Sequence, residues 1–344
     1  MNTLTYKYYL QILLFVAFGM VLLSCNPPDF LDDQDRQALF SEPTQSELDV
    51  VLQDWAFRDL SPQNYTVEQE IPIGTAGTVL QMVSFELEGL KQYGAIVVPN
   101  TENRVPVRMV LNGFSFHPER IETSTTLVGG ESFDIPYIFA IPAFRGQAVH
   151  LVLNGTTYST PISEGDKCNA FDKATDDAIA FLNSIESELP NADMEKVSVR
   201  GGSRGGTVAL LMGERDKRVK KVIGVAGPTN MLVLTSKNEN DPIYKCQFLK
   251  DLVNEKVTLE QARHTMIASS PIYFAQNLPS TQLHLAQNDR IVPVSQGKQL
   301  ESKIEDLNQT ESFKLFIYEN RDHTNIATMN SELRNRIQDF LLGF

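Results

Sequence analysis

The chain has 344 residues and a formal net charge of −13, because 43 Asp and Glu outnumber 30 Lys and Arg. An acidic protein repels phosphate backbones and no basic stripe offsets this charge, so nucleic-acid binding is not expected. Hydrophobic residues make up 42% of the chain, which suits a globular enzyme of one large domain with peripheral segments.

The N-terminus carries a targeting signal. Lys7 precedes an uncharged, largely apolar run over 8–23, which is shorter than a membrane span and suits the core of a signal peptide. The run ends in Leu22-Leu23-Ser24-Cys25 and resembles the lipobox of bacterial lipoproteins. Residues 1–24 are therefore predicted to be a signal peptide, and Cys25 the lipid-bearing residue of a protein anchored at the bacterial cell envelope, outside the cytoplasm. The alternative is an uncleaved anchor helix with an incidental cysteine.

Residues 25–70 are predicted to be an acidic tether that carries one short helix. Pro27-Pro28 and Asp32-Asp33 open this polar stretch. A helical repeat of apolar residues follows at Leu48, Val51, Leu52 and Trp55. The catalytic domain is expected to span 71–344.

The catalytic domain alternates strands and helices. In chain order, strands are predicted over 79–87 and 93–98 (an antiparallel pair), 107–111, 137–142, 196–200, 220–226, 282–286 and 314–318. Helices are predicted after an Asn169 cap, after residue 203, and over 329–340. This alternation predicts an α/β fold, with a mostly parallel central sheet covered by helices on both faces.

For two features of this domain, the sequence allows two alternatives each. Residues 228–279 exceed the length of one crossover helix and form either a lid over the active site or a packed excursion with no catalytic role. Cys168 and Cys246 form either a disulfide or two buried thiols. With no C-x-x-C and no H-x-x-x-H, neither a metal nor a cofactor is expected.

The segment from Lys196 to Met212 contains a nucleophile motif. A strand-like Lys-Val-Ser-Val-Arg precedes Gly201-Gly202-Ser203-Arg204-Gly205, which fits G-x-S-x-G, and an apolar helix start follows. A strand, a Gly-flanked Ser and a helix in that order form the nucleophile elbow of α/β-hydrolases. Glycine fits the tight turn, and the helix N-terminus favours the negative charge that develops in acyl transfer.

A base and an acid follow Ser203 in the expected order. Asp289 comes after the strand at 282–286, and His323 comes after the strand at 314–318. Both lie where the carboxyl ends of strands meet, the edge at which open α/β sheets place their sites. Ser203, Asp289 and His323 are therefore predicted to be the catalytic nucleophile, acid and base.

Other residues compete for these roles. His117, beside the loop after the strand at 107–111, is the most plausible substitute base or substrate contact. Glu319 is a fallback acid, and Asp322 is adjacent to His323 in sequence. His264 and His284 sit in helical and strand patterns and are expected to be structural.

The oxyanion hole needs two N–H donors. One is expected from the backbone of Arg204, directly after the nucleophile. The other is expected from Phe114, in the loop Asn112-Gly113-Phe114-Ser115, where Gly113 permits close approach to a substrate.

The chain from about residue 71 to its end resembles the prolyl-oligopeptidase-like branch of the α/β-hydrolases. The resemblance rests on S-x-G-G at Ser203–Gly206, on Phe144-Arg145-Gly146, on Ser270-Pro271, and on D-x-x-V-P at Asp289–Pro293 with Gln296 following. It implies an α/β-hydrolase fold with Ser203, Asp289 and His323 in the triad roles. Gly202 and Arg204 stand where those peptidases often carry aromatic residues, and their β-propeller is not expected here.

The predicted function is hydrolysis of carboxylic esters, such as those of acylated glycans, through an acyl-enzyme. A serine peptidase acting on short peptides is the second reading. A non-catalytic binding lipoprotein with a hydrolase fold is the third, although a binding module would have no need of Ser, Asp and His together. The predicted partners are a small ester or peptide substrate and, through Cys25, a membrane.

Overall fold

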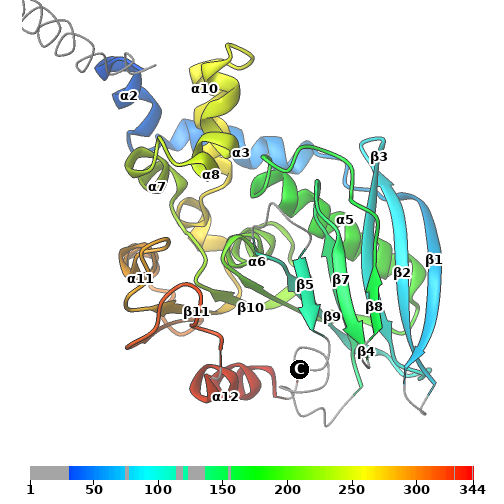
Figure 1. Cartoon of the computed structure of the whole chain (residues 1–344). Helices are drawn as coiled ribbons and strands as arrows, with labels where there is room; N and C mark the ends of the chain where they lie inside the picture. The colour runs from blue at the N-terminus through cyan, green and yellow to red at the C-terminus, as the bar shows by residue number, and fades with distance from the viewer. Residues whose placement is uncertain are drawn as a thin grey trace, which may run out of the picture.

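The computed structural model describes residues 31–73, 77–113, 119–122, 136–153, 156–328, 330–342 and 344. In these residues, nine strands form one sheet in the order β1-β2-β3-β6-β4-β9-β10-β11-β12 (Figure 1). Pairing is parallel from β6 to β12 and antiparallel from β1 to β6, so the predicted mostly parallel sheet is confirmed. The strands are β1 (Gln63–Ile73), β2 (Thr78–Leu87), β3 (Leu90–Val98), β4 (Val105–Leu111), β6 (Ile138–Ala143), β9 (Ala192–Gly202), β10 (Val219–Val225), β11 (Ser280–Ala286) and β12 (Phe313–Tyr318).

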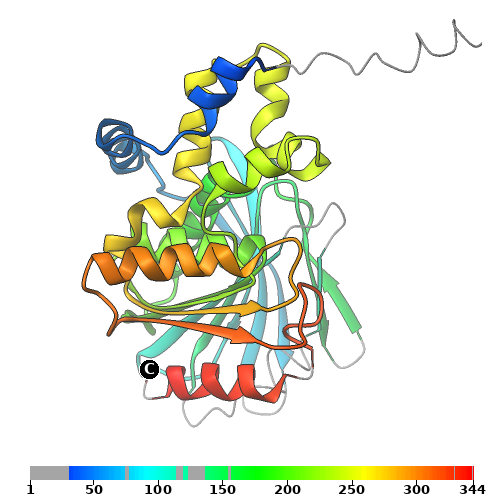
Figure 2. The same cartoon turned by 90° about the vertical axis from the view of Figure 1, so that its left-hand side faces the viewer.

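Helices cover both faces of this sheet. Helices α5 (Asp172–Glu188), α6 (Arg204–Arg215) and α11 (Val294–Asp306) pack on one face in the largest hydrophobic cluster. Helix α12 (Ser331–Leu341) packs on the opposite face, and Figure 2 shows α11 and α12 on the two sides of β11 and β12. A small sheet of β5 (Glu119–Glu122), β7 (Val149–Leu153) and β8 (Thr156–Ser159) lies apart, and β7 packs on the outer strands.

Alternation along the strands explains this layering. In β10, Val222 faces the cluster of α5 and α6, while its neighbours Ile223 and Val225 face α12. Both sides of a parallel strand are buried, which is why such strands read as continuous apolar runs.

Residues 31–73, which overlap the predicted tether, are folded onto the domain. Helices α2 (Asp33–Phe40) and α3 (Gln45–Phe57) bury Leu39, Val51 and Trp55 in a second hydrophobic cluster. The predicted helix at residues 48–55 is therefore confirmed as a packed element. Strand β1 extends the sheet by pairing with β2. Its polar, largely exposed residues carry no apolar alternation, so the sequence did not predict it.

The excursion over 228–279 forms a helical layer against α2 and α3. Its buried residues share one hydrophobic cluster with Val51 and Trp55. Cys246 in this layer forms a disulfide with Cys168, just before α5, with the two Cα atoms 5.3 Å apart. The elements of residues 228–279 are α7 (Met231–Lys237), α8 (Pro242–Tyr244), a π-helical turn η1 (Lys245–Leu249), α9 (Lys250–Val253), α10 (Leu259–Ala268) and a 3-10 segment η2 (Pro271–Asn277).

The predicted Asn169 cap is wrong. Helix α5 begins at Asp172, with Phe171 as its N-cap residue and no side-chain cap. Asn169 instead lies in a turn, where its backbone N–H binds the carbonyl of Asp166. The Asp172 carboxylate binds Trp55 and Arg58 of the N-terminal region, a long-range contact that fixes where the helix starts.

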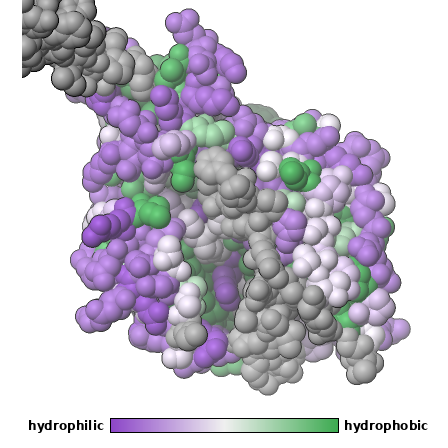
Figure 3. All heavy atoms as spheres, viewed as in Figure 1, coloured by the Kyte–Doolittle hydropathy of each residue, from purple (hydrophilic) through white to green (hydrophobic). Residues whose placement is uncertain are grey.

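The surface agrees with the acidic composition. Hydrophilic residues predominate on the face in Figure 3, and hydrophobic ones are scattered. Within the part of the chain that is described, no helix has the length and apolar character needed to cross a bilayer. The predicted signal segment and Cys25 lie outside the described residues.

Glu214 on α6 makes stability depend on pH. Its carboxylate is buried, has no hydrogen-bond partner among the described residues, and burial raises its pKa well above the usual range, against the smaller effect of Arg215. The folded state therefore holds a proton that the unfolded chain releases, and stability falls as the pH rises above about 4.5. Glu214→Gln, which cannot ionise, is expected to gain stability relative to wild type between pH 5 and pH 8 in thermal unfolding. An equal difference at both pH values would contradict this.

Candidate active site

Ser203 sits in a sharp turn between β9 and α6. Its backbone has φ 52° and ψ −122°, a conformation that residues with side chains rarely adopt. Neighbouring glycines allow the turn: a Cβ on Gly201 would lie 2.0 Å from the carbonyl oxygen of Gly205, and one on Gly205 2.0 Å from that of Leu111. Glycine two positions on either side of Ser203 is thus a steric requirement, as the motif predicts.

Ser203, His323 and Asp289 come together in one hydrogen-bonded line. The Ser203 Oγ lies 2.9 Å from Nε2 of His323, and Nδ1 of the same ring lies 2.8 Å from Oδ2 of Asp289. These contacts join three loops that follow β9, β11 and β12, at the carboxyl edge of the sheet. The arrangement can take a proton from the serine hydroxyl and hold the histidine in one tautomer.

The Asp289 carboxylate is held in place from both sides. Its side chain has no exposed surface. Oδ1 accepts the backbone N–H groups of Ile291 and Val292, each at 2.8 Å, which leaves Oδ2 to bind the histidine. Gln296 of the same motif accepts the N–H groups of Thr229 and Asn230 through Oε1, and so joins the acid loop to the segment after β10.

The loop that carries His323 is built onto the acid loop. Beyond the ends of β11 and β12, Gln287 N–H binds the Tyr318 carbonyl and Asn288 N–H binds the Arg321 carbonyl. Asp322 closes the turn by accepting the Thr324 hydroxyl and the backbone N–H groups of Asn325 and Thr324, and these bonds lower the pKa of its carboxyl.

The competing residues take other positions. Glu319 is exposed in the turn after β12, and the carboxylate that binds the His323 ring is that of Asp289. His284 is buried in β11, where burial lowers its pKa to about 3, and it bonds to Tyr318 and Gln282. His264 lies on α10 beside Asp54. His117 falls outside the described residues.

The Arg204 side chain turns into the protein, although the residue directly follows Ser203. It is only 2% exposed. Nε and Nη2 donate to the carbonyl of Asn112 at 3.3 and 3.1 Å, Nη2 donates to Oε1 of Gln147 at 2.5 Å, and the guanidinium lies over the Phe144 ring. Asn112 opens the loop predicted to supply the second oxyanion donor. The contact between Arg204 and Asn112 was not predicted from the sequence.

A buried ion pair holds the segment that contacts Arg204. Arg145, in the Phe144–Gly146 motif, binds Asp177 of α5 at 2.6 Å, and the Arg145 backbone N–H donates to the same carboxylate. Burial lowers the pKa of Arg145, but the charge and hydrogen bonds of Asp177, together with the charges of Asp176 and Glu88, outweigh it and raise the pKa. The motif therefore fixes Phe144 and Gln147, which contact Arg204 together with Asn112.

The oxyanion loop is described only at its start. Asn112 is buried and Gly113 half-buried, whereas Phe114 lies outside the described residues. The backbone of Arg204 occupies the first turn of α6, the position predicted for the other donor.

Comparison with known sequences identifies a family for this chain. The sequence profile of the prolyl oligopeptidase family matches residues 137–344, which include Ser203, Asp289 and His323. The chain belongs to the prolyl oligopeptidase family. Members of this family are hydrolases, which makes hydrolysis the reaction class of the chain. A comparison with curated proteins gives no match.

Solved structures show the same α/β-hydrolase fold. Acetyl xylan esterase 1 from Thermoanaerobacterium sp. JW/SL YS485 has a TM-score of 0.63 and 13% identity, over 91% of this chain and 99% of that one. Acetyl xylan esterase from Paenibacillus sp. R4 has 0.65 and 14%, over 90% and 99%. The acylaminoacyl peptidase of Pyrococcus horikoshii has 0.56 and 15%, over 76% of this chain and 41% of that one.

Removing the Arg204 side chain tests its hold on the loop. Arg204→Ala is expected to lower kcat by about 10²-fold with a small effect on KM, because a displaced oxyanion donor acts mainly in the transition state. Steady-state kinetics on an acetyl ester measures this. Arg263→Ala, which removes a buried arginine bonded to Glu47 and the Leu39 carbonyl, is the control for general destabilisation and should leave kcat unchanged. Equal kcat values for wild type and Arg204→Ala would refute the role.

Proposed function

We propose that this protein is a serine hydrolase that cleaves short acyl esters, such as acetyl groups on a glycan, through an acyl-enzyme. The observation that carries the proposal is the unbroken line from Ser203 Oγ through His323 to Asp289, with 2.9 and 2.8 Å contacts. A non-catalytic binding role is disfavoured, because binding alone does not require a base at hydrogen-bonding distance from a serine hydroxyl.

The proposed chemistry follows from these contacts. Ser203 Oγ attacks the ester carbonyl as its proton passes to Nε2 of His323, and the Asp289 carboxylate stabilises the imidazolium through Nδ1. The backbone N–H groups of Arg204 and Phe114 are proposed to bind the oxyanion. The imidazolium then protonates the leaving alcohol, and water, activated by the same histidine, releases the acid and restores Ser203.

Two observations favour an ester over an amide. This chain covers 99% of the length of each of the two acetyl xylan esterases, but 41% of the acylaminoacyl peptidase. An amide needs a well-placed acid to protonate its amine, and peptidases meet this demand with binding energy from several substrate residues. The residues beside Ser203 are Gly202 and an inward-turned Arg204, so no aromatic pair flanks the nucleophile to hold a peptide.

A peptidase is the second candidate. The match to the prolyl oligopeptidase family and the similarity to an acylaminoacyl peptidase favour it.

The nucleophile is tested with esters and a fluorophosphonate. Wild type is expected to hydrolyse p-nitrophenyl acetate and acetylated xylo-oligosaccharides and to be labelled by the probe. Ser203→Ala should remain folded, lose labelling and lose about 10⁴ to 10⁶ in kcat, because Ser203 forms the covalent bond. His323→Ala should be nearly as damaging, and Asp289→Asn less so.

Control measurements separate the candidates. Labelling that persists in Ser203→Ala would end the serine mechanism. A kcat/KM for a peptide amide at or above that of the best acetyl ester would favour the peptidase. Lys220→Ala, at a half-buried position on β10 away from the triad, should match wild type.

The proposal includes a lipid anchor on Cys25 at the bacterial cell envelope. The lipobox-like Leu22–Cys25 sequence supports it, as does the Cys168–Cys246 disulfide, because disulfides persist in oxidising compartments. Expressed in a bacterium, wild type should partition into detergent and Cys25→Ser should not carry lipid. Mass spectrometry of the mature N-terminal peptide measures this, and an unmodified Cys25 in membrane-bound protein would refute the anchor.

A further inference from the structure

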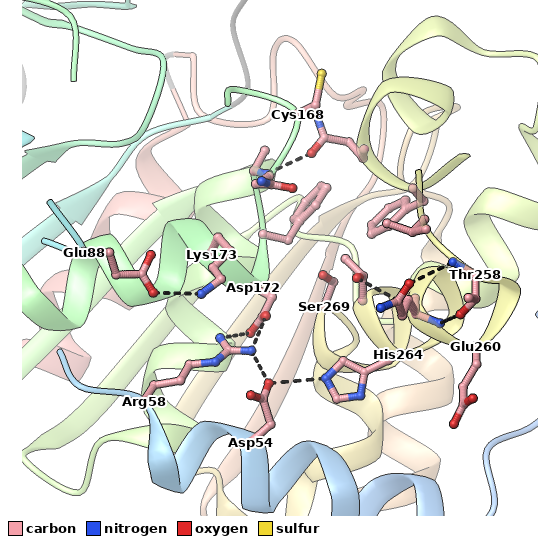
Figure 4. A pocket seen from close by; sticks show the side chains of 18 residues that line it. Asp54, Arg58, Glu88, Cys168, Asp172, Lys173, Thr258, Glu260, His264 and Ser269 are labelled. Carbon is pink, nitrogen blue, oxygen red and sulfur yellow. Dashed lines mark hydrogen bonds and ion pairs between the residues drawn. The ribbon is translucent and has the colours of Figure 1, made fainter. Parts of the chain in front are cut away.

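A cavity of about 980 Å³ lies between α3, the start of α5 and the helical layer of residues 228–279. None of Ser203, Asp289 and His323 is among the described residues that line it. Its volume is at the upper end of the range for small-molecule pockets, about 300–1,000 Å³. Figure 4 shows side chains from three regions converging on it: Asp54 of α3 and Arg58 directly after it, Asp172 and Lys173 of α5, and His264 of α10.

The walls of this cavity are fixed before any ligand binds. Arg58 joins Asp54 at 2.5 Å and Asp172 at 2.8 Å, and Asp54 also bonds to His264. Lys173 binds Glu88 at 3.1 Å (Figure 4). Cys168 also lines the cavity, and its disulfide to Cys246 links the α5 wall to the π-helical turn of the excursion. A preformed site loses less entropy when it binds.

One polar group in the wall has an unused bonding capacity. Gln247, in the π-helical turn, lines the cavity and is 5% exposed. Its Oε1 accepts the Ala170 N–H at 2.9 Å, but its Nε2 has no partner in the part of the chain that is described. A buried donor without a partner costs about 1–3 kcal/mol, and because Nε2 is closed to solvent, a ligand gains this hydrogen bond only where the Gln247 side chain turns toward the cavity.

The remaining lining selects the chemistry of that ligand. Four acids (Asp54, Glu88, Asp172 and Glu260) face two permanent cations, Arg58 and Lys173, which disfavours anions. Carboxylate and amide oxygens accept hydrogen bonds from hydroxyl groups. Phe171 and Phe248, stacked with ring centroids 5.9 Å apart, add an apolar surface. Hydroxyls that both donate and accept, combined with apolar C–H faces, are the features of a sugar.

We propose that this cavity is a binding subsite for a neutral oligosaccharide, separate from the triad. The proposal rests on the proposed function, since it takes the glycan as the carrier of the ester. The subsite would hold one stretch of the glycan while an acyl group elsewhere on it reaches Ser203.

Trp55 gives a direct readout of binding. It is the only tryptophan of the chain, and its Nε1 donates at 2.8 Å to Oδ1 of Asp172, which lines the cavity. Xylotetraose titrated into Ser203→Ala protein is therefore expected to change the tryptophan emission saturably. Tetragalacturonate, which is anionic, should not.

Two variants test the location. Thr265→Tyr places a ring in the cavity and removes only a hydroxyl bond within α10, and it should weaken xylotetraose binding by 10-fold or more. Gln247→Glu keeps the acceptor for Ala170 and removes the donor, and should weaken it by about 10-fold. Lys256→Tyr adds the same ring at an exposed position outside the cavity and should bind like the parent.

The outcomes separate this inference from the proposed function. Ester hydrolysis by wild type without any tryptophan response to xylotetraose would overturn the subsite and leave the esterase. Saturable binding without ester hydrolysis would support the subsite and overturn the esterase. Binding that Lys256→Tyr and Thr265→Tyr weaken equally, or tighter binding of tetragalacturonate or of a tetrapeptide, would also refute the subsite.

Discussion

The positive φ of Ser203 is the constraint on which the rest of the site depends. A residue with a side chain is held in a rarely populated conformation because glycines at 201 and 205 let the strand, the helix and the β4 carbonyl of Leu111 approach within contact distance. The backbone bond from Ser203 N–H to the Val225 carbonyl locks the turn to the neighbouring strand. The hydroxyl is thereby lifted off the sheet toward the loops that follow β11 and β12.

A series of buried contacts runs from α5 to the loop that begins at Asn112. Asp177 holds Arg145, the turn of Arg145 fixes Phe144 and Gln147, and these hold the guanidinium of Arg204 against the Asn112 carbonyl. These side chains are buried, and each polar group forms hydrogen bonds with the next one. Removing one side chain therefore leaves a buried polar group without its partner, which is destabilising. The family motif around Arg145 thus acts on the site through packing and charge, without reaching the triad itself.

The sequence predicted what local pattern controls. Periodicity predicts the strands of the nine-stranded sheet from β2 to β12 and the helix at residues 48–55, but not the small sheet of β5, β7 and β8. Motif spacing, and the rule that parallel strands end at one edge, predict the proximity of Ser203, Asp289 and His323. The sequence missed what long-range contacts control: the pairing of polar strand β1, the docking of residues 31–57, the start of α5 and the inward turn of Arg204. A charged side chain beside a nucleophile reads as a surface residue until its buried partners are known.

The Cys168–Cys246 disulfide closes a loop over a sequence separation of 78 that contains β9, Ser203, α6 and β10. This closure lowers the conformational entropy of the unfolded chain, and in the chain-entropy relation that loss stabilises the folded state by roughly 4.5 kcal/mol. The strained turn at Ser203 thus lies inside the loop that the disulfide closes, where the unfolded conformations of the chain are restricted. Oxidation of Cys168 and Cys246 therefore favours the folded conformation of the segment that holds the turn at Ser203.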